Sequence, residues 1–329
     1  MFPLSEIAAY LESSGARIEP GRNSFTWAPE PFSRATFAAL PLHRDLGDGS
    51  AVTEQAEWVL RAPWMEGVDD ATLNEWNLFA SVAGFGHYPG SGELVLTSKV
   101  GIYAGDGAAA SRNYAPIMAT AAAGLGWIAE RFARSDFDVS PHACPFHQVD
   151  EPPPVGPGEF ASVLETYLNR MGVLGSAGTD SLSAEFPWDE GAVTAMARLP
   201  DVRASLMGAT GYSSAQADRA AGRTALMLIR SDLHHPWFGR GIFSTLELPM
   251  GGDLPTLLTL VRELNQWELA TPELPPFFGA WVVGPRAPMF QTFVPNQLCV
   301  PGIVVNLTAW AASRARMVRE WLGEEGIRH

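Results

Sequence analysis

Hydrophobic residues recur along the chain at two spacings, and these separate predicted helices from predicted strands. Spacings of three and four residues predict helices over residues 4–15, 69–77, 113–132, 160–171, 253–267 and 306–322. Alternation with a period of two predicts strands over residues 36–42, 52–60, 93–103, 224–229, 241–248, 280–283 and 289–294. Each half of the chain is therefore expected to follow the order helix, strands, helix, strands, helix.

Three side chains mark where helices should begin. Asp69, Asp253 and Asn306 each stand just before a run of apolar residues at helical spacing. A carboxylate or amide oxygen at this place accepts a hydrogen bond from a main-chain N–H of the first turn. We therefore predict that these three residues are N-caps.

The same short motifs occur once in each half, in the same order. Tyr10-Leu11 followed by Gly15 corresponds to Tyr167-Leu168 followed by Gly172, 157 residues later. FTW at residues 25–27 corresponds to FPW at 186–188, and LNEWN at 73–77 corresponds to LNQWE at 264–268. The separation grows to 161 and then 191 residues, which we interpret as insertions into a second copy of one domain. Two related domains are usually arranged as in a homodimer, about a pseudo-two-fold axis.

A proline-rich segment lies between the two copies. It contains Pro141, Pro145, Pro152, Pro153, Pro154 and Pro157. Clustered prolines are typical of an extended, semi-rigid linker. We therefore predict a first domain over residues 1–135, a linker over 136–158 and a second domain over 159–329.

The composition narrows the choice of partners. Of 329 residues, 47% are hydrophobic and 18% are charged, which is typical of a globular protein. The formal net charge is −14, so we expect no binding to nucleic acid or to an anionic membrane surface. A basic or amphipathic protein segment is the partner that this charge favours. Lys99 is the only lysine, and the chain has no P-loop motif.

The cysteines and the apolar runs indicate a compartment. Cys144 and Cys299 are the only cysteines, which is too few for a small secreted scaffold held by disulfides. Residues 1–6 have no basic region of the kind that begins a signal peptide. The longest apolar run without a charge, residues 114–129, is too short to span a bilayer. We therefore expect a soluble, cytoplasmic protein.

Three segments of the first half resemble YbjN-like and type III secretion chaperone-like domains. They are residues 73–77, the strand that begins with ELVL at 93–96 and the long helix after it. The second copy resembles them through residues 264–267, 280–283 and 306–322. The resemblance covers most of each half. It implies an α+β fold in which each domain is a twisted antiparallel sheet with flanking helices. It also implies an acidic dimer that holds other proteins, here as a pseudo-dimeric monomer or as a homodimer.

One segment has the spacing of a metal site. His142, Cys144 and His147 place three soft ligands within six residues, and Asp150 or His87 could supply a fourth for zinc. The motif lies in the linker and has no counterpart in the second copy. We therefore expect no metal and no other cofactor.

Two alternatives to a binding protein stay open. The chain could be an enzyme, either zinc-dependent through the linker motif or with His87, His142 or His234 as a general base. It could also be a structural subunit of a larger assembly. No G-x-S-x-G elbow and no dinucleotide-binding fingerprint is present, so the sequence favours no particular reaction.

Aromatic residues are the main candidates for contact with a partner. Trp58, Trp76, Trp267 and Trp310 lie at core spacing and are expected to be buried. Six others lie in segments that we expect to be exposed loops: Trp64, Phe85, Trp237, Phe238, Phe277 and Phe278. Exposed aromatics mark recognition surfaces. We therefore predict a non-enzymatic, chaperone-like module that binds a protein or peptide in an apolar groove or at an exposed sheet edge.

Overall fold

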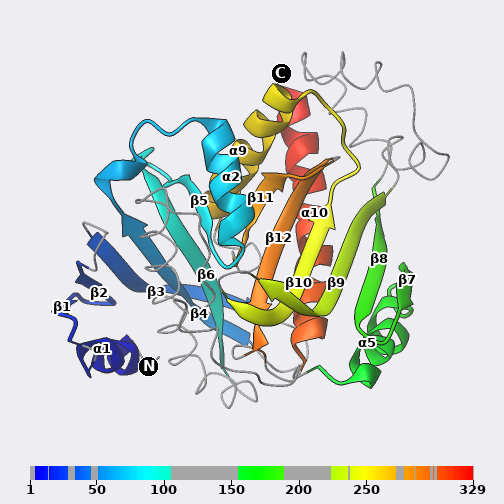
Figure 1. Ribbon diagram of the computed structural model, residues 1–329, viewed down its shortest axis with the longest axis horizontal. Coiled ribbons are helices and arrows are strands. Elements are labelled where there is room, and N and C mark those ends of the chain that lie inside the picture. The colour runs from blue at the N-terminus through cyan, green and yellow to red at the C-terminus, as the bar shows by residue number, and fades with distance from the viewer. Residues whose placement is uncertain are drawn as a thin grey trace. The chain divides into compact units, whose positions relative to one another are not determined.

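The computed structural model describes residues 4–13, 15–28, 34–45, 51–104, 155–188, 224–235, 238–271, 278–285, 287–296, 299 and 302–328. The chain divides into two compact units, each of which contains a six-stranded sheet (Figure 1). The first unit comprises residues 1–151, 234–239 and 265–280, and the second comprises 152–233, 240–264 and 281–329. Most of the predicted linker, residues 136–154, lies outside the described residues.

The first sheet is built from the first third of the chain. Its elements are α1 (Leu4–Ser13), β1 (Glu19–Pro20), β2 (Ser24–Trp27), β3 (Arg34–Asp45), β4 (Ala51–Arg61), the short helical turn η1 (Pro63–Met65), α2 (Asp70–Ala80), β5 (Gly84–His87) and β6 (Leu94–Ala104). The strands are antiparallel in the order β1-β2-β3-β4-β6-β5. The predicted helix at residues 113–132 lies outside the described residues.

The second sheet has the same plan. Its elements are α5 (Pro157–Val163), the π-helical turn η4 (Leu164–Leu168), β7 (Leu174–Ala177), β8 (Ser181–Pro187), β9 (Thr224–His235), β10 (Gly239–Glu247), α9 (Leu254–Ala270), β11 (Ala280–Val283), β12 (Pro288–Pro295) and α10 (Ile303–Arg328). Its strand order, β7-β8-β9-β10-β12-β11, repeats that of the first sheet strand for strand. The predicted α+β fold with antiparallel sheets is therefore confirmed, whereas the pseudo-dimer arrangement stays a prediction.

The repeat extends to individual hydrogen bonds at the start of each copy. Gly15 N donates to Glu12 O at 2.9 Å, and Gly172 N donates to Asn169 O at 3.2 Å, 157 residues later. Both glycines have positive φ values, +88° and +68°, a backbone region in which a side chain is strained. The two glycines of the repeated motif therefore end the first helical segment of each copy in the same way.

The first hairpins are also equivalent, and they correct one motif alignment. Gly21 N donates to Ser24 O and Gly178 N donates to Ser181 O, again 157 residues apart. Within these hairpins Phe25 is paired with Pro20, and Leu182 is paired with Ala177. Phe25 therefore corresponds to Leu182, and the FPW motif lies four residues further along β8 than the FTW motif lies along β2. The apparent growth of the separation to 161 residues reflects a longer strand rather than an insertion.

Two of the three predicted helix caps are confirmed. Asp69 Oδ1 accepts a hydrogen bond from Thr72 N at 2.7 Å, and Asp253 Oδ1 accepts one from Thr256 N at 2.9 Å. The prediction for Asn306 is wrong, because α10 begins at Ile303. The apolar spacing of this helix continues back by one turn, so Asn306 lies inside it.

Aromatic stacking across strands forms the core of the first unit. Phe37 on β3 lies 5.0 Å from Phe25, 5.1 Å from Trp27 and 5.7 Å from Trp58, measured between ring centroids. Trp58 is buried as predicted, whereas Trp76, Trp267 and Trp310 are only half-buried.

The core of the second unit joins β11 and β12 to α10. Trp281 contacts Phe290 edge to face at 5.5 Å. The Arg314 guanidinium lies 3.6 Å above the Phe290 ring on a buried side chain, so a cation–π contact accompanies its burial. No helix in the described part of the chain is long and apolar enough to cross a membrane.

Candidate functional site

The aromatic residues proposed for partner contact are mostly inside the protein. Phe85, Phe238 and Phe278 are buried, so the expectation that they are exposed on loops is wrong. Trp64 is half-buried and lies 5.5 Å from the Trp76 ring. Trp237 and Phe277 lie outside the described residues. The described members of this set therefore offer no exposed aromatic patch.

Phe85 is buried because a side chain of α2 holds its strand. Asn77 Oδ1 accepts a hydrogen bond from Phe85 N at 2.7 Å, and Asn77 Nδ2 donates one to Phe85 O at 3.1 Å. One buried amide thus satisfies both main-chain groups of a strand residue. Glu268 stands at the equivalent place of the second LNxW motif, where a carboxylate cannot donate. The two copies of this motif therefore cannot form the same pair of hydrogen bonds at this position.

The only lysine lies in a buried cluster of charges in the first unit. Lys99 is paired with Glu57 across β4 and β6, and the charged atoms are 3.9 Å apart. Lys99 Nζ also donates to Leu269 O in the last turn of α9, where the helix dipole favours a cation. Tyr88 Oη donates to Glu57 Oε2 at 3.3 Å. This cluster joins a segment of the second half of the chain to the first sheet.

Burial governs the titration of this cluster. Desolvation raises the pKa of Glu57, against the opposing effect of the neighbouring Lys99 charge. Desolvation also lowers the pKa of Lys99, against the opposing effect of Glu57 and then Glu268. Both directions are those expected when a charge leaves water. The groups satisfy one another, so we assign the cluster a structural role.

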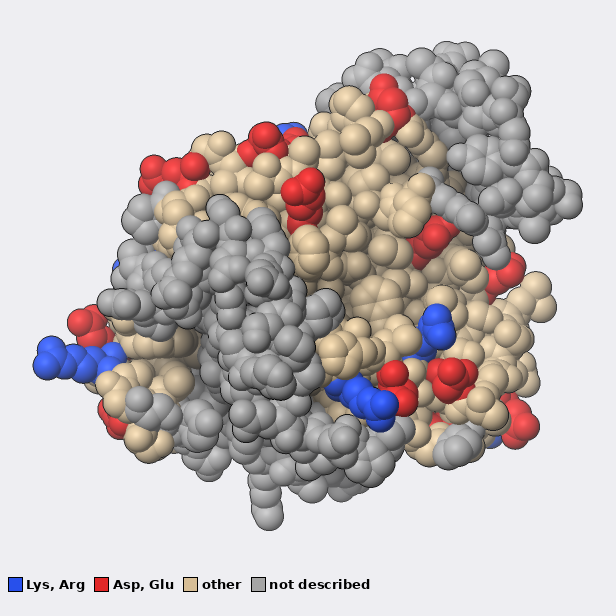
Figure 2. All heavy atoms as spheres, viewed as in Figure 1, with Lys and Arg blue, Asp and Glu red and all other residues tan. Residues whose placement is uncertain are grey.

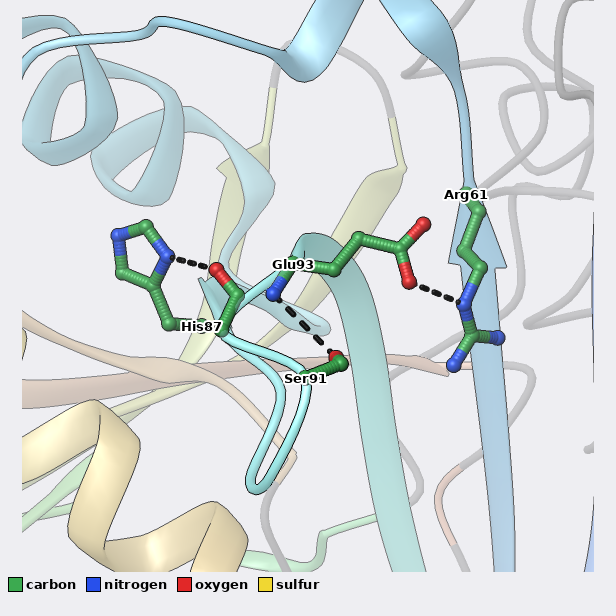
Figure 3. A network of polar contacts seen from close by, with 5 residues as sticks. Arg61, His87, Ser91 and Glu93 are labelled. Atoms are coloured by element: carbon green, nitrogen blue, oxygen red, sulfur yellow. Dashed lines mark hydrogen bonds and ion pairs between the residues drawn. The ribbon is translucent and has the colours of Figure 1, made fainter.

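A pocket of about 440 Å³ opens in the first unit between the chain after β4 and the β5–β6 hairpin. Its apolar wall contains Ala62, Met65 and Leu94, and its polar rim contains Glu66 and His87. Figure 3 shows the β5–β6 hairpin with His87 at one side and Glu93 directed toward Arg61 at the other. The pocket therefore has one histidine beside an apolar wall.

Hydrogen bonds order the rim of this pocket. His87 Nδ1 lies 2.9 Å from Gly92 O, and a carbonyl oxygen only accepts, so Nδ1 carries the proton. In the neutral ring Nε2 is then left as an acceptor or base. Arg61 Nε donates to Glu93 Oε2 at 2.8 Å (Figure 3), and the Arg61 guanidinium lies 5.3 Å from the Tyr88 ring centroid. Sequence reasoning identified His87 but not this pocket, because the segment after β4 carries no motif.

The remaining histidines do not form a metal site in the described residues. His234 is exposed and His235 is buried, as expected for neighbours on a strand. Among the residues that the structure describes, no group of three His, Cys, Asp or Glu side chains could hold a metal ion. His142, Cys144 and His147 lie outside these residues.

The outer edge of each sheet near the first hairpin is the other candidate site. Strand β1 ends the first sheet and β7 ends the second (Figure 1). The residues of both strands are largely exposed. An exposed sheet edge carries main-chain groups that can pair with another chain.

The register of the β7–β8 hairpin shows which main-chain groups face outward. Gly178 and Ser181 form a hydrogen-bonded pair at the turn, and such pairs alternate along an antiparallel ladder. The N–H and C=O groups of Ser176 and Leu174 therefore point to β8. Those of Ala177 and Gly175 point away from it, to the open edge.

The same reasoning places a proline at the edge of the first sheet. Gly21 and Ser24 form the hydrogen-bonded pair at the turn of the β1–β2 hairpin, so the next residue back, Pro20, faces outward. Pro20 is the counterpart of Ala177, because both precede the turn glycine and the two hairpins share their register. Proline has no N–H to donate. The first edge therefore lacks the donor that the second edge offers.

The two faces of β7 differ. A Cβ atom added to Gly175 would lie 3.1 Å from Leu164 Cδ1 and 3.3 Å from Leu168 Cδ1, so η4 packs against this face. Leu174 and Ser176 lie on the opposite face, and Leu174 is 74% exposed. The open edge thus has an apolar side chain on the face that the helical segment does not cover.

Acidic side chains are spread over the described surface in Figure 2, with few basic ones among them.

No protein-family model, curated protein or solved structure matches this chain.

Proposed function

We propose that this chain is a non-enzymatic, chaperone-like protein-binding module, built as two copies of one domain. It binds an extended segment of another protein, which adds to the second sheet as a further strand beside β7. The observation that carries this proposal is the outward-facing N–H of Ala177, at the position where the first copy has Pro20. Strand addition of this kind supplies affinity through main-chain hydrogen bonds.

The geometry supports an association of moderate strength. Gly175 and Ala177 present two N–H and two C=O groups, and each hydrogen bond contributes about 0.5–1.5 kcal/mol net. Burying the exposed Leu174 side chain contributes about 1.5–3 kcal/mol more. The cost of association offsets much of this sum. The site therefore suits reversible binding of an extended segment.

The test is the variant Ala177→Pro, with Ala177→Ser as the matched control. The proline removes the outward N–H and keeps the β7–β8 hydrogen bonds, whereas the serine keeps both. Proteins retained from native extract by the wild-type chain and by Ala177→Ser, but lost from Ala177→Pro, would support the proposal. The amides of Gly175 and Ala177 should also exchange more slowly with deuterium when a purified partner is added. Retention of every partner by Ala177→Pro would contradict it.

A second candidate function rests on the pocket beside His87. The bond from His87 Nδ1 to Gly92 O leaves Nε2 as an acceptor beside an apolar wall, and histidine is the side chain that most often acts as a general base. We propose it as the alternative, an enzyme in which His87 accepts a proton from a small substrate. Turnover in a substrate screen that is lost in His87→Gln, with folding intact, would support this alternative. Turnover that His87→Gln leaves unchanged would rule it out.

A further inference from the structure

The surface beside β7 also carries information about the sequence of the segment that binds there. Residues paired across an antiparallel ladder point to the same face of the sheet. On the face opposite η4, Leu174 is paired with Glu185 and Ser176 with Ser183. A strand added outside β7 would extend these two rows by one residue each.

The first row favours an apolar residue in the partner. Leu174 is the most exposed large apolar side chain in the described residues. A partner side chain directly opposite it would lie about 4.5–5.5 Å away between Cβ atoms. An apolar residue there removes the Leu174 side chain from water, whereas a charged residue would lose hydration without a partner.

The second row favours a long basic residue. Ser176 and Ser183 are small, and their hydroxyl oxygens lie 3.0 Å apart. A long side chain opposite Ser176 can therefore extend over both serines toward Glu185, which is the diagonal neighbour of Ser176 on the same face of β8. Glu185 is half-buried on β8 and forms no ion pair within the described part of the chain. Glu185 and Asp180 are the acidic residues near this row, since a Cβ atom added to Gly178, on the same face as Ser176, would lie 3.8 Å from Asp180 Oδ1. Glu185 is the one that a side chain extended over the two serines approaches.

A second copy of this chain is a poorer occupant of the same edge. The chain carries a net charge of −14, so two copies repel each other before they meet. Pairing of β7 with itself would also bring two Glu185 carboxylates to the same face, with no added cation. The charge of the whole chain and the charge beside the edge both favour a basic partner.

We propose that β7 binds an extended protein segment in which an apolar residue and a lysine or arginine alternate on one face, two positions apart. The apolar residue lies opposite Leu174, and the basic residue lies opposite Ser176 and extends to Glu185. This inference rests on the proposed function, since it specifies the partner of the same edge.

The test uses three synthetic peptides of equal length in which valine alternates on one face with lysine, serine or glutamate. Fluorescence anisotropy measures their binding to the full chain, to Glu185→Gln and to Glu75→Gln, an exposed glutamate on α2 that removes the same charge elsewhere. The lysine peptide should bind about two- to five-fold more tightly than the serine peptide, as for a partly exposed ion pair. Glu185→Gln should remove this advantage, whereas Glu75→Gln should keep it.

The outcomes separate the two proposals. Equal binding of all three peptides, lost in Ala177→Pro, would overturn the choice of a basic residue and leave strand addition intact. An advantage for lysine that Glu185→Gln leaves unchanged would overturn the assignment to Glu185. Binding of every peptide that Ala177→Pro leaves unchanged, or no binding at all, would overturn strand addition itself. A dimer on sizing that Ala177→Pro converts to a monomer would show that a second copy occupies the edge.

Discussion

The edges at β1 and β7 are formed by equivalent hairpins, yet they expose different chemistry. The first edge strand consists of Glu19 and Pro20 and follows Arg17, whereas the second carries Leu174, Ser176 and Ala177 at the positions 157 residues later. Charged residues and proline at an edge strand discourage pairing with another chain. Because the two hairpins share their register, a few side chains are enough to make the two edges differ.

The two halves also differ in what they contribute to the compact units. Residues 234–239 and 265–280 come from the second half but belong to the first unit, whereas the second unit takes no residue before 152. Within the first unit, His235 Nε2 contacts Phe79 O and Lys99 Nζ donates to Leu269 O, so each contact joins a residue of the second half to one of the first.

Asn77→Ala should have the largest effect on stability. It leaves the buried N–H and C=O of Phe85 without partners, which costs about 2–4 kcal/mol. Urea unfolding measures the loss of stability, and Glu75→Ala, at an exposed position of the same helix, is the control. A loss of less than about 1 kcal/mol in the free energy of unfolding would show that water satisfies these groups. The difference between Asn77 and Glu268 in the two copies would then have little effect on stability.

Acid should weaken the first unit through His235. Phe238 N donates to His235 Nδ1 at 3.3 Å, and Nε2 lies 3.1 Å from Phe79 O, so the neutral ring satisfies both contacts. Desolvation lowers the pKa of His235 to about 4. Because the folded-state value is depressed, the stabilisation is complete above the ordinary pKa and is lost as pH falls through the window down to about 4. Across this window the free energy of unfolding should fall by about 3 kcal/mol.

This pH effect is checked by urea unfolding across the window in the wild-type chain, in His235→Gln and in His234→Gln. The glutamine at 235 cannot take up a proton, so its stability should change less with pH. The exposed His234 is the matched control, and because its charge has the smallest of the effects on the pKa of His235, its replacement should change the slope much less. An unchanged slope in His235→Gln would assign the acid sensitivity to carboxylates instead.

Ser176→Pro should destabilise the second unit where Ala177→Pro does not. The N–H of Ser176 points to β8, so its loss breaks a ladder hydrogen bond and costs about 1–3 kcal/mol. The N–H of Ala177 points outward, and Pro20 shows that this hairpin position accepts proline. Thermal unfolding of both variants measures the contrast. Equal destabilisation would mean that the assignment of inward and outward groups is reversed.

Opening the first edge should have the smallest effect. The double variant Arg17→Leu, Pro20→Ala restores the outward N–H and gives the edge an apolar residue, as in the second copy. Because β1 is only two residues long, we expect weak peptide binding at a second site, about two- to five-fold above background. Anisotropy in an Ala177→Pro background isolates this site. No gain would show that strand length, rather than side chains, closes the first edge.

Part of this structure could be predicted from the sequence because it depends on local physics. Asp69 and Asp253 cap their helices as predicted, since capping needs only residues within one turn. Each of the seven predicted strands overlaps a strand in the structure. Short strands such as β1, β5 and β7 were missed because two to four residues are too few to show alternation.

The candidate site was harder to predict. The expected exposure of Phe85 failed because Asn77 and α2 cover its strand, and such a contact joins segments with no local signal for it. For the edge at β7, the sequence predicts only that some exposed sheet edge could bind a partner, and it does not indicate which strand forms that edge. Locating it required the register of the hairpin, which shows that Ala177 faces outward.

The sequence by itself determined that the chain is acidic, alternates helices with strands and repeats its motifs in two halves. These properties follow from composition and from periodicities that each segment carries alone. Only the tertiary structure decided which strands end each sheet, which copy of the repeat has an open edge and which aromatics are buried. These depend on pairing between distant segments, and a shift of one residue in that pairing reverses which groups face outward.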